Sequence, residues 1–217
     1  MFSGHYEDWR RTRFNGILKY IEKDFFINKS LLELGGGYGD NGNLFKNLGS
    51  IVTSSDARNE HLIIGKNKYP DIKFELLDCD NDLIKEKYDI ILHWGVLYHL
   101  KNIEFNLKNV CEKCDYLLLE TEVCNSLDDS TNLLLFENNS YDQAYNRYGS
   151  RPSEKMIEKI LTNSNFNFKL IMDPILNSGI HKYDWENINS GDYECGKRRF
   201  WICWKNNIEF PIKVIDN

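Results

Sequence analysis

The residues with the clearest chemical potential lie between Leu31 and Asp40, in the sequence LLELGGGYGD. A short apolar run there ends at the acidic residue Glu33, and glycines follow at positions 35, 36, 37 and 39. Glycine adopts positive φ without strain and lets a ligand approach the main chain, so the run predicts a sharp turn after a strand. A helix from about Gly42 to Leu48 would then point its N-terminal amides at the ligand. The alternative is a tight turn that binds nothing.

Two ligand classes use such a turn, and the glycine pattern fits both. Gly37, Gly39 and Gly42 satisfy the G-x-G-x-x-G pattern of dinucleotide-binding proteins. Glu33, with Gly35, Gly37 and Gly39, satisfies the E-x-G-x-G-x-G pattern of proteins that bind S-adenosylmethionine. A carboxylate at the end of the strand repels a diphosphate but accepts hydrogen bonds from an ammonium group. S-adenosylmethionine carries an ammonium, a sulfonium and no phosphate, so the position of Glu33 favours it.

Polar residues also follow the other strands that must position such a ligand. Apolar runs predict these strands at about residues 50–56, 72–77, 88–92 and 116–119. In open α/β sheets the ligand lies beyond the carboxyl ends of the strands. Asp56, 23 residues after Glu33, is therefore expected to hold two ribose hydroxyls. Asp78 is expected to meet the exocyclic amine of an adenine.

These ordered motifs resemble the class I S-adenosylmethionine-dependent methyltransferases. The resemblance rests on ELGGGYG, SSDAR, LLDCD, YDIILHWGVLYHL and YLLLETEV, and covers about residues 28–125. It implies an α/β, Rossmann-like fold, with a seven-stranded, mostly parallel sheet, helices on both faces and an antiparallel last strand. It implies S-adenosyl-L-methionine as the cofactor, and His93 with Trp94 as the floor of the methyl-transfer site. The cofactor-binding residues expected on this basis are Glu33, Gly35, Gly37, Asp56, Ala57, Asp78, Cys79, His93 and Trp94.

Length and composition predict a single domain over residues 1–217. We expect an N-terminal helical lid in residues 1–27, a cofactor-binding half in 28–125 and a substrate-side half in 126–217. The lid contains Trp9, Arg10 and Arg13 on a segment with helical apolar spacing. These side chains could have a structural role, anchoring the core or lying as charges in solvent. Alternatively, they could form a lid that contacts the cofactor carboxylate or the substrate.

The overall charge argues against nucleic acid and membranes as general partners. The net charge is −6 and the isoelectric point is near 5.4, so no broad attraction to polyanions is expected. No apolar run approaches the roughly 18 residues of a membrane span, and the start lacks the apolar core of a signal peptide. The expected location is cytoplasmic, where the six cysteines are read as free thiols. No metal site is expected from their spacing.

The second half predicts a substrate-side structure. Ser153 is placed to cap a helix that runs to about Leu161, and residues 166–172 and 199–204 predict two antiparallel strands. Between these strands lies a long segment, 173–197, rich in glycine, asparagine and aromatic residues. Connections of this length are usually functional or disordered, and the aromatic residues argue against disorder.

Methyl transfer to an alcohol needs a base that removes the hydroxyl proton, and histidine suits neutral pH. His181 lies in the aromatic segment with Asp184 as a possible orienting partner, and His99 follows the strand that ends near His93. Glu120, with Glu122 close by, could act as a base or hold a divalent cation. The catalytic candidates are thus His181, His99, Asp184 and Glu120.

The acceptor is the least constrained part of the prediction. The third-strand motif is HWGV, which differs from the Asp/Asn-Pro-Pro pattern of enzymes that methylate nucleic-acid bases. Aromatic residues mixed with Asp, Asn and His suit a polyhydroxylated acceptor, and the C-terminal half looks similar to methyltransferases found with glycan-building enzymes. We therefore expect O-methylation of a sugar or glycan hydroxyl. The alternatives are another small molecule or RNA, a non-catalytic methyltransferase-like binding subunit, and a nicotinamide-dependent oxidoreductase.

Overall fold

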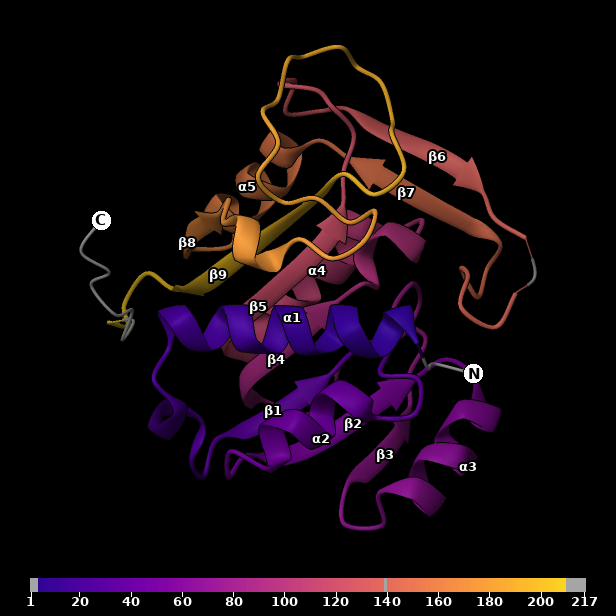
Figure 1. Cartoon of the computed structure of the whole chain (residues 1–217), viewed down its shortest axis with the longest axis vertical. Helices are drawn as coiled ribbons and strands as arrows, with labels where there is room; N and C mark the ends of the chain where they lie inside the picture. The colour runs from indigo at the N-terminus through magenta and orange to yellow at the C-terminus, as the bar shows by residue number, and fades with distance from the viewer. Residues whose placement is uncertain (1–3, 139, 210–217) are drawn as a thin grey trace.

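A seven-stranded sheet forms the centre of the protein, described here from a computed structural model over residues 4–138 and 140–209 (Figure 1). Every neighbouring pair is parallel except those of β9, which is antiparallel to both of its neighbours. In spatial order the strands are β3 (Lys73–Leu76), β2 (Ile51–Asp56), β1 (Ser30–Glu33), β4 (Tyr88–Trp94), β5 (Cys114–Glu122), β9 (Arg198–Lys205) and β8 (Phe166–Ile171). The predicted fold, including its antiparallel last strand, is confirmed.

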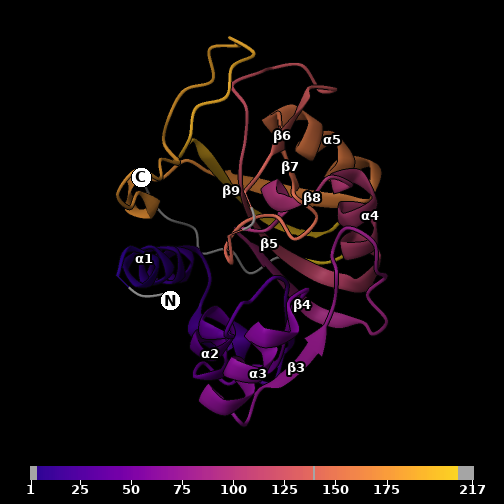
Figure 2. The same ribbon diagram turned by 90° about the vertical axis from the view of Figure 1, so that its right-hand side faces the viewer.

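Helices cover both faces of this sheet (Figure 2). One face carries α1 (His5–Tyr20), α2 (Asp40–Lys46) and α3 (Asn59–Lys68), and the other carries α4 (Ile103–Lys113) and α5 (Glu154–Asn163). Two separate apolar cores result, because each strand of a sheet covered on both faces points alternate side chains to opposite sides. Leu31 packs in the core below α1 and α2, whereas Leu32 packs in the core below α4 and α5.

The strand order reverses at β1, which lies between β2 and β4. Glu33 at the end of β1 is level with Ser54 of β2 and Leu92 of β4. Chains leave β1 and β4 toward opposite faces of the sheet, so a crevice opens beyond their carboxyl ends. The glycine turn after β1 lies at this crevice.

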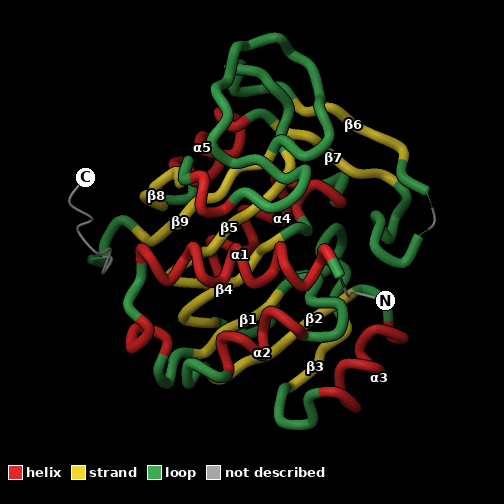
Figure 3. The backbone as a smooth tube through the Cα atoms, viewed as in Figure 1, coloured by secondary structure: helices red, strands yellow, loops and turns green. Residues whose placement is uncertain are grey.

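A second, two-stranded sheet was not predicted from the sequence. It consists of β6 (Asn132–Phe136) and β7 (Tyr148–Pro152), paired antiparallel outside the main sheet (Figure 3). Its connection returns the chain toward the carboxyl edge, beside the short 3-10 helix η2 (Leu97–His99). The second half of the chain therefore contributes a hairpin as well as strands β8 and β9.

The helix ends agree with the sequence at α5 and differ from it at α1. The Ser153 hydroxyl accepts a hydrogen bond from the Met156 amide at 3.0 Å, which confirms the predicted cap of α5. The N-terminal helix ends at Tyr20, earlier than expected, because Ile21 takes an extended conformation and a 3-10 helix, η1 (Lys23–Phe26), follows. A further 3-10 helix, η3 (Pro174–Leu176), begins the long aromatic segment. Within the described ranges, no helix combines the length and apolar character needed to cross a membrane.

Candidate active site

A cavity lies at the carboxyl edge of β1, β2 and β4, and we call it the main cavity. Its walls come from α1, the glycine turn, the ends of β2 and β3, η2 and the connection between β6 and β7. Eight of the predicted site residues line it: Gly35, Gly37, Asp56, Ala57, Asp78, Cys79, Trp94 and His99. Five others lie outside its lining: Glu33, His93, Glu120, His181 and Asp184.

The glycine turn opens the main chain toward the main cavity. Gly35, Gly37 and Gly39 have φ values of 56°, 58° and 81°, in the left-handed region that favours glycine. A Cβ on Gly36 would lie 2.2 Å from the Ser54 hydroxyl and 2.6 Å from the Glu33 carboxyl carbon. The turn is therefore packed tightly against the strand ends below it and has no room for side chains on that side.

Glu33 lies under this turn. It is fully buried, and its Oε2 accepts a hydrogen bond from the Ser54 hydroxyl at 2.7 Å. Its Oε1 is buried without a hydrogen-bond partner among the described residues. Burial raises the pKa of Glu33 to about 7, although hydrogen bonds from Ser54, the Gly42 backbone and Asn41 act in the opposite direction. The carboxyl group thus supports the turn from beneath.

Asp56, at the end of β2, faces the main cavity. Its Oδ2 accepts a hydrogen bond from the Gly37 amide at 3.0 Å, and its Oδ1 accepts one from the Arg58 amide at 2.8 Å. The His61 ring nitrogen Nδ1 lies 3.2 Å from the same Oδ1. Each carboxylate oxygen has two acceptor sites, so Oδ2, which has one partner, retains capacity for a hydroxyl donor.

Helix α1 forms another wall of the main cavity. Trp9, Arg10 and Arg13 all line the main cavity. Arg10 lies 3.4 Å from Asp40 in α2, and Arg13 pairs with Glu120 of β5 at 2.9 Å. The N-terminal segment therefore faces the site, and both arginines are held in place by carboxylates of other elements.

His93 does not reach the main cavity. It is fully buried, and its Nε2 lies 2.8 Å from Oδ1 of Asn106 in α4. Burial lowers the pKa of His93 to about 4, so the ring is neutral at physiological pH. Because side chains alternate along β4, His93 points to the α4 face and the next residue, Trp94, reaches the cavity wall.

Glu120 forms the centre of a buried network of charges. Its oxygens accept hydrogen bonds from Arg13 at 2.9 Å, from Nε of Arg198 at 2.5 Å and from the Tyr183 hydroxyl at 3.0 Å. Burial alone raises the pKa of Glu120, but Arg198 and Arg13 lower it below its ordinary value. Glu122 is likewise paired with Arg198 and with Arg151. Through these contacts Glu120 holds α1, β5 and β9 together. Among the residues described, no cluster of metal-ligating side chains occurs.

His181 and Asp184 lie in the long segment after β8 but do not pair with each other there. The His181 ring stacks on Trp9 with centroids 4.0 Å apart, and its Nδ1 is buried with no partner in the described part of the chain. Burial, followed by the charge of Arg198, lowers the pKa of His181 to about 4. Asp184 is exposed and accepts a hydrogen bond from Asn177 at 2.9 Å. The expected orienting contact is not formed.

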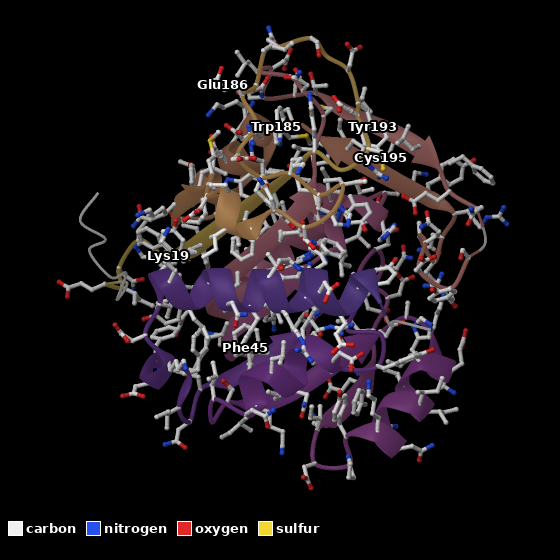
Figure 4. The ribbon with its side chains drawn as sticks, viewed as in Figure 1. Lys19, Phe45, Trp185, Glu186, Tyr193 and Cys195 are labelled. Carbon is white, nitrogen blue, oxygen red and sulfur yellow. The ribbon has the colours of Figure 1, made fainter. Side chains whose placement is uncertain are left out.

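The aromatic residues of this segment pack against the protein. Tyr183 is fully buried and accepts a hydrogen bond from the Trp9 indole at 2.9 Å. The Trp185 indole donates to the Arg198 carbonyl at 3.0 Å, and the guanidinium of Arg199 lies 3.8 Å from its ring centroid. Figure 4 shows Trp185 and Tyr193 on the same loop, well above Phe45 of α2. No residue of the segment lines the main cavity.

His99 is the predicted base that does line the main cavity. Its Nδ1 lies 2.6 Å from Oε2 of Glu137, which directly follows β6. Sequence reasoning missed Glu137, because it lies 38 residues away in a hairpin that no pattern announced. It also missed a set of aromatic and polar wall residues: Tyr6, Tyr98, Tyr141, Asp142, Gln143, Tyr145 and Asn146. The concentration of tyrosines in 141–148 was the available signal.

Comparisons with known proteins bear on this site. Residues 6–170 match the family described as a methyltransferase domain. No curated protein matches the chain.

Solved structures with a similar fold share little sequence with the chain. The N-terminal domain of EvdMO1, crystallised in the presence of S-adenosylhomocysteine (SAH) and D-fucose, is 14% identical. Its TM-score is 0.68 over 94% of this chain and 84% of that one. An S-adenosylmethionine-dependent methyltransferase from Mesorhizobium loti is 12% identical, with a TM-score of 0.61 over 94% and 98%. Magnesium protoporphyrin IX methyltransferase from Synechocystis PCC 6803, with bound SAM, is 14% identical, with a TM-score of 0.59 over 91% and 79%. At these identities the likeness concerns the fold.

Proposed function

Because the chain belongs to the methyltransferase-domain family, with S-adenosylmethionine as its cofactor, we propose that it methylates a hydroxyl group of a sugar or glycan. The observation that carries this proposal is the presence of His99 in the same cavity as the glycine turn and Asp56. A cofactor wall and a group able to accept a hydroxyl proton thus face one space.

The charges of the main cavity fit the cofactor. S-adenosylmethionine has a sulfonium and an ammonium group, and a carboxylate-rich wall stabilises both. The lining contains more acidic than basic side chains: Asp40, Asp56, Asp78, Asp80 and Asp142 against Arg10, Arg13 and Arg58.

The positions of the lining residues support an assignment of the parts of the cofactor. We place the methionine portion at Gly35 and Gly37, the ribose at Asp56 with Ala57, and the adenine at Asp78 with Cys79. Trp94 then lies beside the sulfur. Glu33 and His93 act on this arrangement from behind the wall, through the turn and through α4.

The acceptor side of the main cavity suits a polyhydroxylated ring. Tyrosine and tryptophan faces pack on the C–H surfaces of sugars, while amides and carboxylates bind hydroxyls. The neighbouring structure of EvdMO1 was obtained in the presence of a deoxy sugar, D-fucose, which supports the same class of acceptor. The aromatic lining consists of Tyr6, Trp9, Trp94, Tyr98, Tyr141 and Tyr145.

The proposed reaction needs one proton acceptor. The acceptor oxygen forms a bond to the methyl carbon as the carbon–sulfur bond breaks and its electron pair stays on sulfur. The hydroxyl proton passes to Nε2 of His99, because the other ring nitrogen is engaged by Glu137.

The test combines cofactor binding with an acceptor screen on the full chain. Calorimetry with SAH measures binding, and methyl-labelled S-adenosylmethionine is then offered with free and nucleotide-linked hexoses and deoxyhexoses, and with RNA. Label in a sugar supports the proposal. Binding of SAH with label only in RNA or in another compound overturns the acceptor assignment, and no binding of SAH favours a non-catalytic binding subunit.

A further inference from the structure

Glu137 connects the cavity histidine with the chain segment that covers the cavity. Its Oε2 accepts two hydrogen bonds, from the His99 ring at 2.6 Å and from the Ala144 amide at 2.7 Å. The side chain is about 95% buried, so both contacts are protected from water. One carboxylate oxygen therefore fixes a residue of η2 and a residue of the connection between β6 and β7.

The ionised state of Glu137 decides which ring nitrogen of His99 carries the proton. Burial alone raises the pKa of Glu137, but the hydrogen bond from His99, the hydrogen bond from the Ala144 amide and the charge of Arg151 lower it below its ordinary value. A carboxylate only accepts hydrogen bonds, so Nδ1 of His99 must be the donor. In the neutral ring Nε2 is then the free acceptor. No described residue bonds to Nε2, and His99 lines the main cavity.

The covering segment, residues 140–147, is attached to three walls of the main cavity. The Tyr6 hydroxyl of α1 donates to Asp142 at 2.8 Å, and Arg58 donates to the Gln143 carbonyl at 2.8 Å. Asn146 donates to Asp80 at 3.3 Å. Arg58 and Asp80 lie next in sequence to the residues assigned to the ribose and the adenine, so the segment, whose Tyr141 and Tyr145 line the acceptor side, also reaches the cofactor side of the site.

Arg151 and Gly149 of β7 fix Glu137 from behind. Arg151 lies 3.4 Å from Oε1 of Glu137 and donates to the Tyr98 carbonyl at 2.8 Å. A Cβ on Gly149 would lie 2.2 Å from Oε1 of Glu137 and 2.4 Å from the same carbonyl. The hairpin therefore approaches η2 as closely as backbone geometry permits, and the carboxylate has little freedom to turn away.

We propose that Glu137 is a positioning residue that holds His99 in the tautomer needed for proton removal. Through Glu137, this tautomer depends on the position of the covering segment. The proposal rests on the assignment of His99 as the base. Cofactor binding favours the conformation in which the covering segment is bonded to the cavity walls. In that conformation the Ala144 amide donates to Glu137, and the same carboxylate aligns His99. Glu137 itself touches neither cofactor nor acceptor.

The test uses Glu137→Gln in the full chain with SAH as the probe. Nitrogen-15 NMR of labelled histidines, with His99 assigned from His99→Gln, reports the tautomer, and hydrogen exchange reports protection of the Ala144 amide. Glu104→Gln, an exposed helical residue paired with Lys108, is the matched control. Tyr6→Phe removes one attachment of the segment and leaves Glu137 intact.

In the wild type and the control we expect a single His99 tautomer protonated at Nδ1, and greater protection of Ala144 when SAH is added. In Glu137→Gln the tautomers mix and the Ala144 amide exchanges faster, while SAH affinity stays within about threefold. Tyr6→Phe should reduce the gain in protection and mix the tautomers in part. With an acceptor from the screen, kcat should fall at least about tenfold in Glu137→Gln with the KM for S-adenosylmethionine unchanged.

Separate outcomes contradict the inference and the proposed function. A His99 tautomer that is the same in Glu137→Gln as in the wild type overturns the positioning role. A tautomer that does not respond to Tyr6→Phe overturns the link to the covering segment. If the wild type is active and His99→Ala retains full turnover, the assignment of His99 as the base is wrong instead. If the protein does not bind SAH, the proposed function is wrong.

Discussion

Replacing Glu33 with glutamine should stabilise the ligand-free protein above pH 7. The carboxyl group is fully buried beneath the glycine turn and has one oxygen without a partner. Glutamine keeps its shape, can still accept from Ser54 and Gly42, and adds a donor near Asn41, whose Oδ1 is also unpartnered. The substitution therefore removes a charge without opening a cavity.

The size of the effect follows from the pKa of Glu33. Burial raises this pKa from 4.5 to about 7, so the folded protein binds the proton more tightly than the unfolded chain does. Stability therefore falls as the pH rises from about 4.5 and reaches its full loss above about 7. The difference between these two pKa values corresponds to about 3 kcal/mol of unfolding free energy. Glutamine does not ionise, so the variant does not lose this stability. For a chain of 217 residues this is a rise in Tm of roughly 6 to 12 °C.

Urea unfolding followed by circular dichroism at pH 5 and pH 8.5 measures the difference between Glu33→Gln and the wild type. We expect nearly equal stability at pH 5 and a more stable variant at pH 8.5, with SAH affinity within about threefold. The exposed Glu104→Gln variant should show no such pH dependence. A variant that is less stable at both pH values would refute the reasoning. A tenfold loss of SAH affinity would show that the carboxylate contacts the cofactor ammonium group.

Four further results are expected. Asp56→Ala should weaken SAH binding by about 1.5 to 3 kcal/mol in calorimetry, because charge-assisted hydrogen bonds to ribose are lost; unchanged affinity would move the ribose elsewhere. Gly37→Val should abolish SAH binding while circular dichroism still shows a folded domain, since its φ of 58° strains any β-branched residue. His99→Ala should lower kcat about 10²- to 10⁴-fold with SAH affinity unchanged, whereas His181→Ala should mainly lower Tm; the reverse pattern would return the base to the long segment. Glu120→Ala should destabilise the fold by about 3 to 5 kcal/mol in urea unfolding because it leaves the buried Arg13 without a carboxylate and removes one of the two carboxylates paired with Arg198, and added Mg²⁺ should not restore activity.

The main sheet could be predicted because its strands are locally encoded. Parallel strands buried on both faces require continuous apolar runs, and β1, β4 and β5 supply them. Glycines and acids at the strand ends then locate the carboxyl edge. The β6–β7 hairpin is less clearly encoded, since the apolar run of β6 is partly exposed and β7, although mostly buried, has the polar sequence YGSRP. Its position depends on contacts with η2 that only the folded chain brings together.

The cavity wall was predictable to the same extent as the strands. Asp56 ends β2 and Asp78 comes two residues after the end of β3, so sheet topology alone brings them to the edge. Glu33 and His93 follow the same rule in sequence, yet their side chains point behind the wall. The difference arises from a one-residue alternation along each strand and from the packing of a turn, and neither can be resolved when strand ends are uncertain by a residue.

The two candidate bases show why proximity in sequence misleads. Asp184 lies three residues from His181, but the segment between them turns so that the ring stacks on Trp9 and the carboxylate reaches solvent. His99 has no acid close by in its own element, and its partner Glu137 arrives from the hairpin. A histidine that acts as a base needs a fixed tautomer and access to the substrate at once. For His99, the proposed base, long-range packing would supply both, because the hairpin that supplies Glu137 also lines the main cavity through its connection.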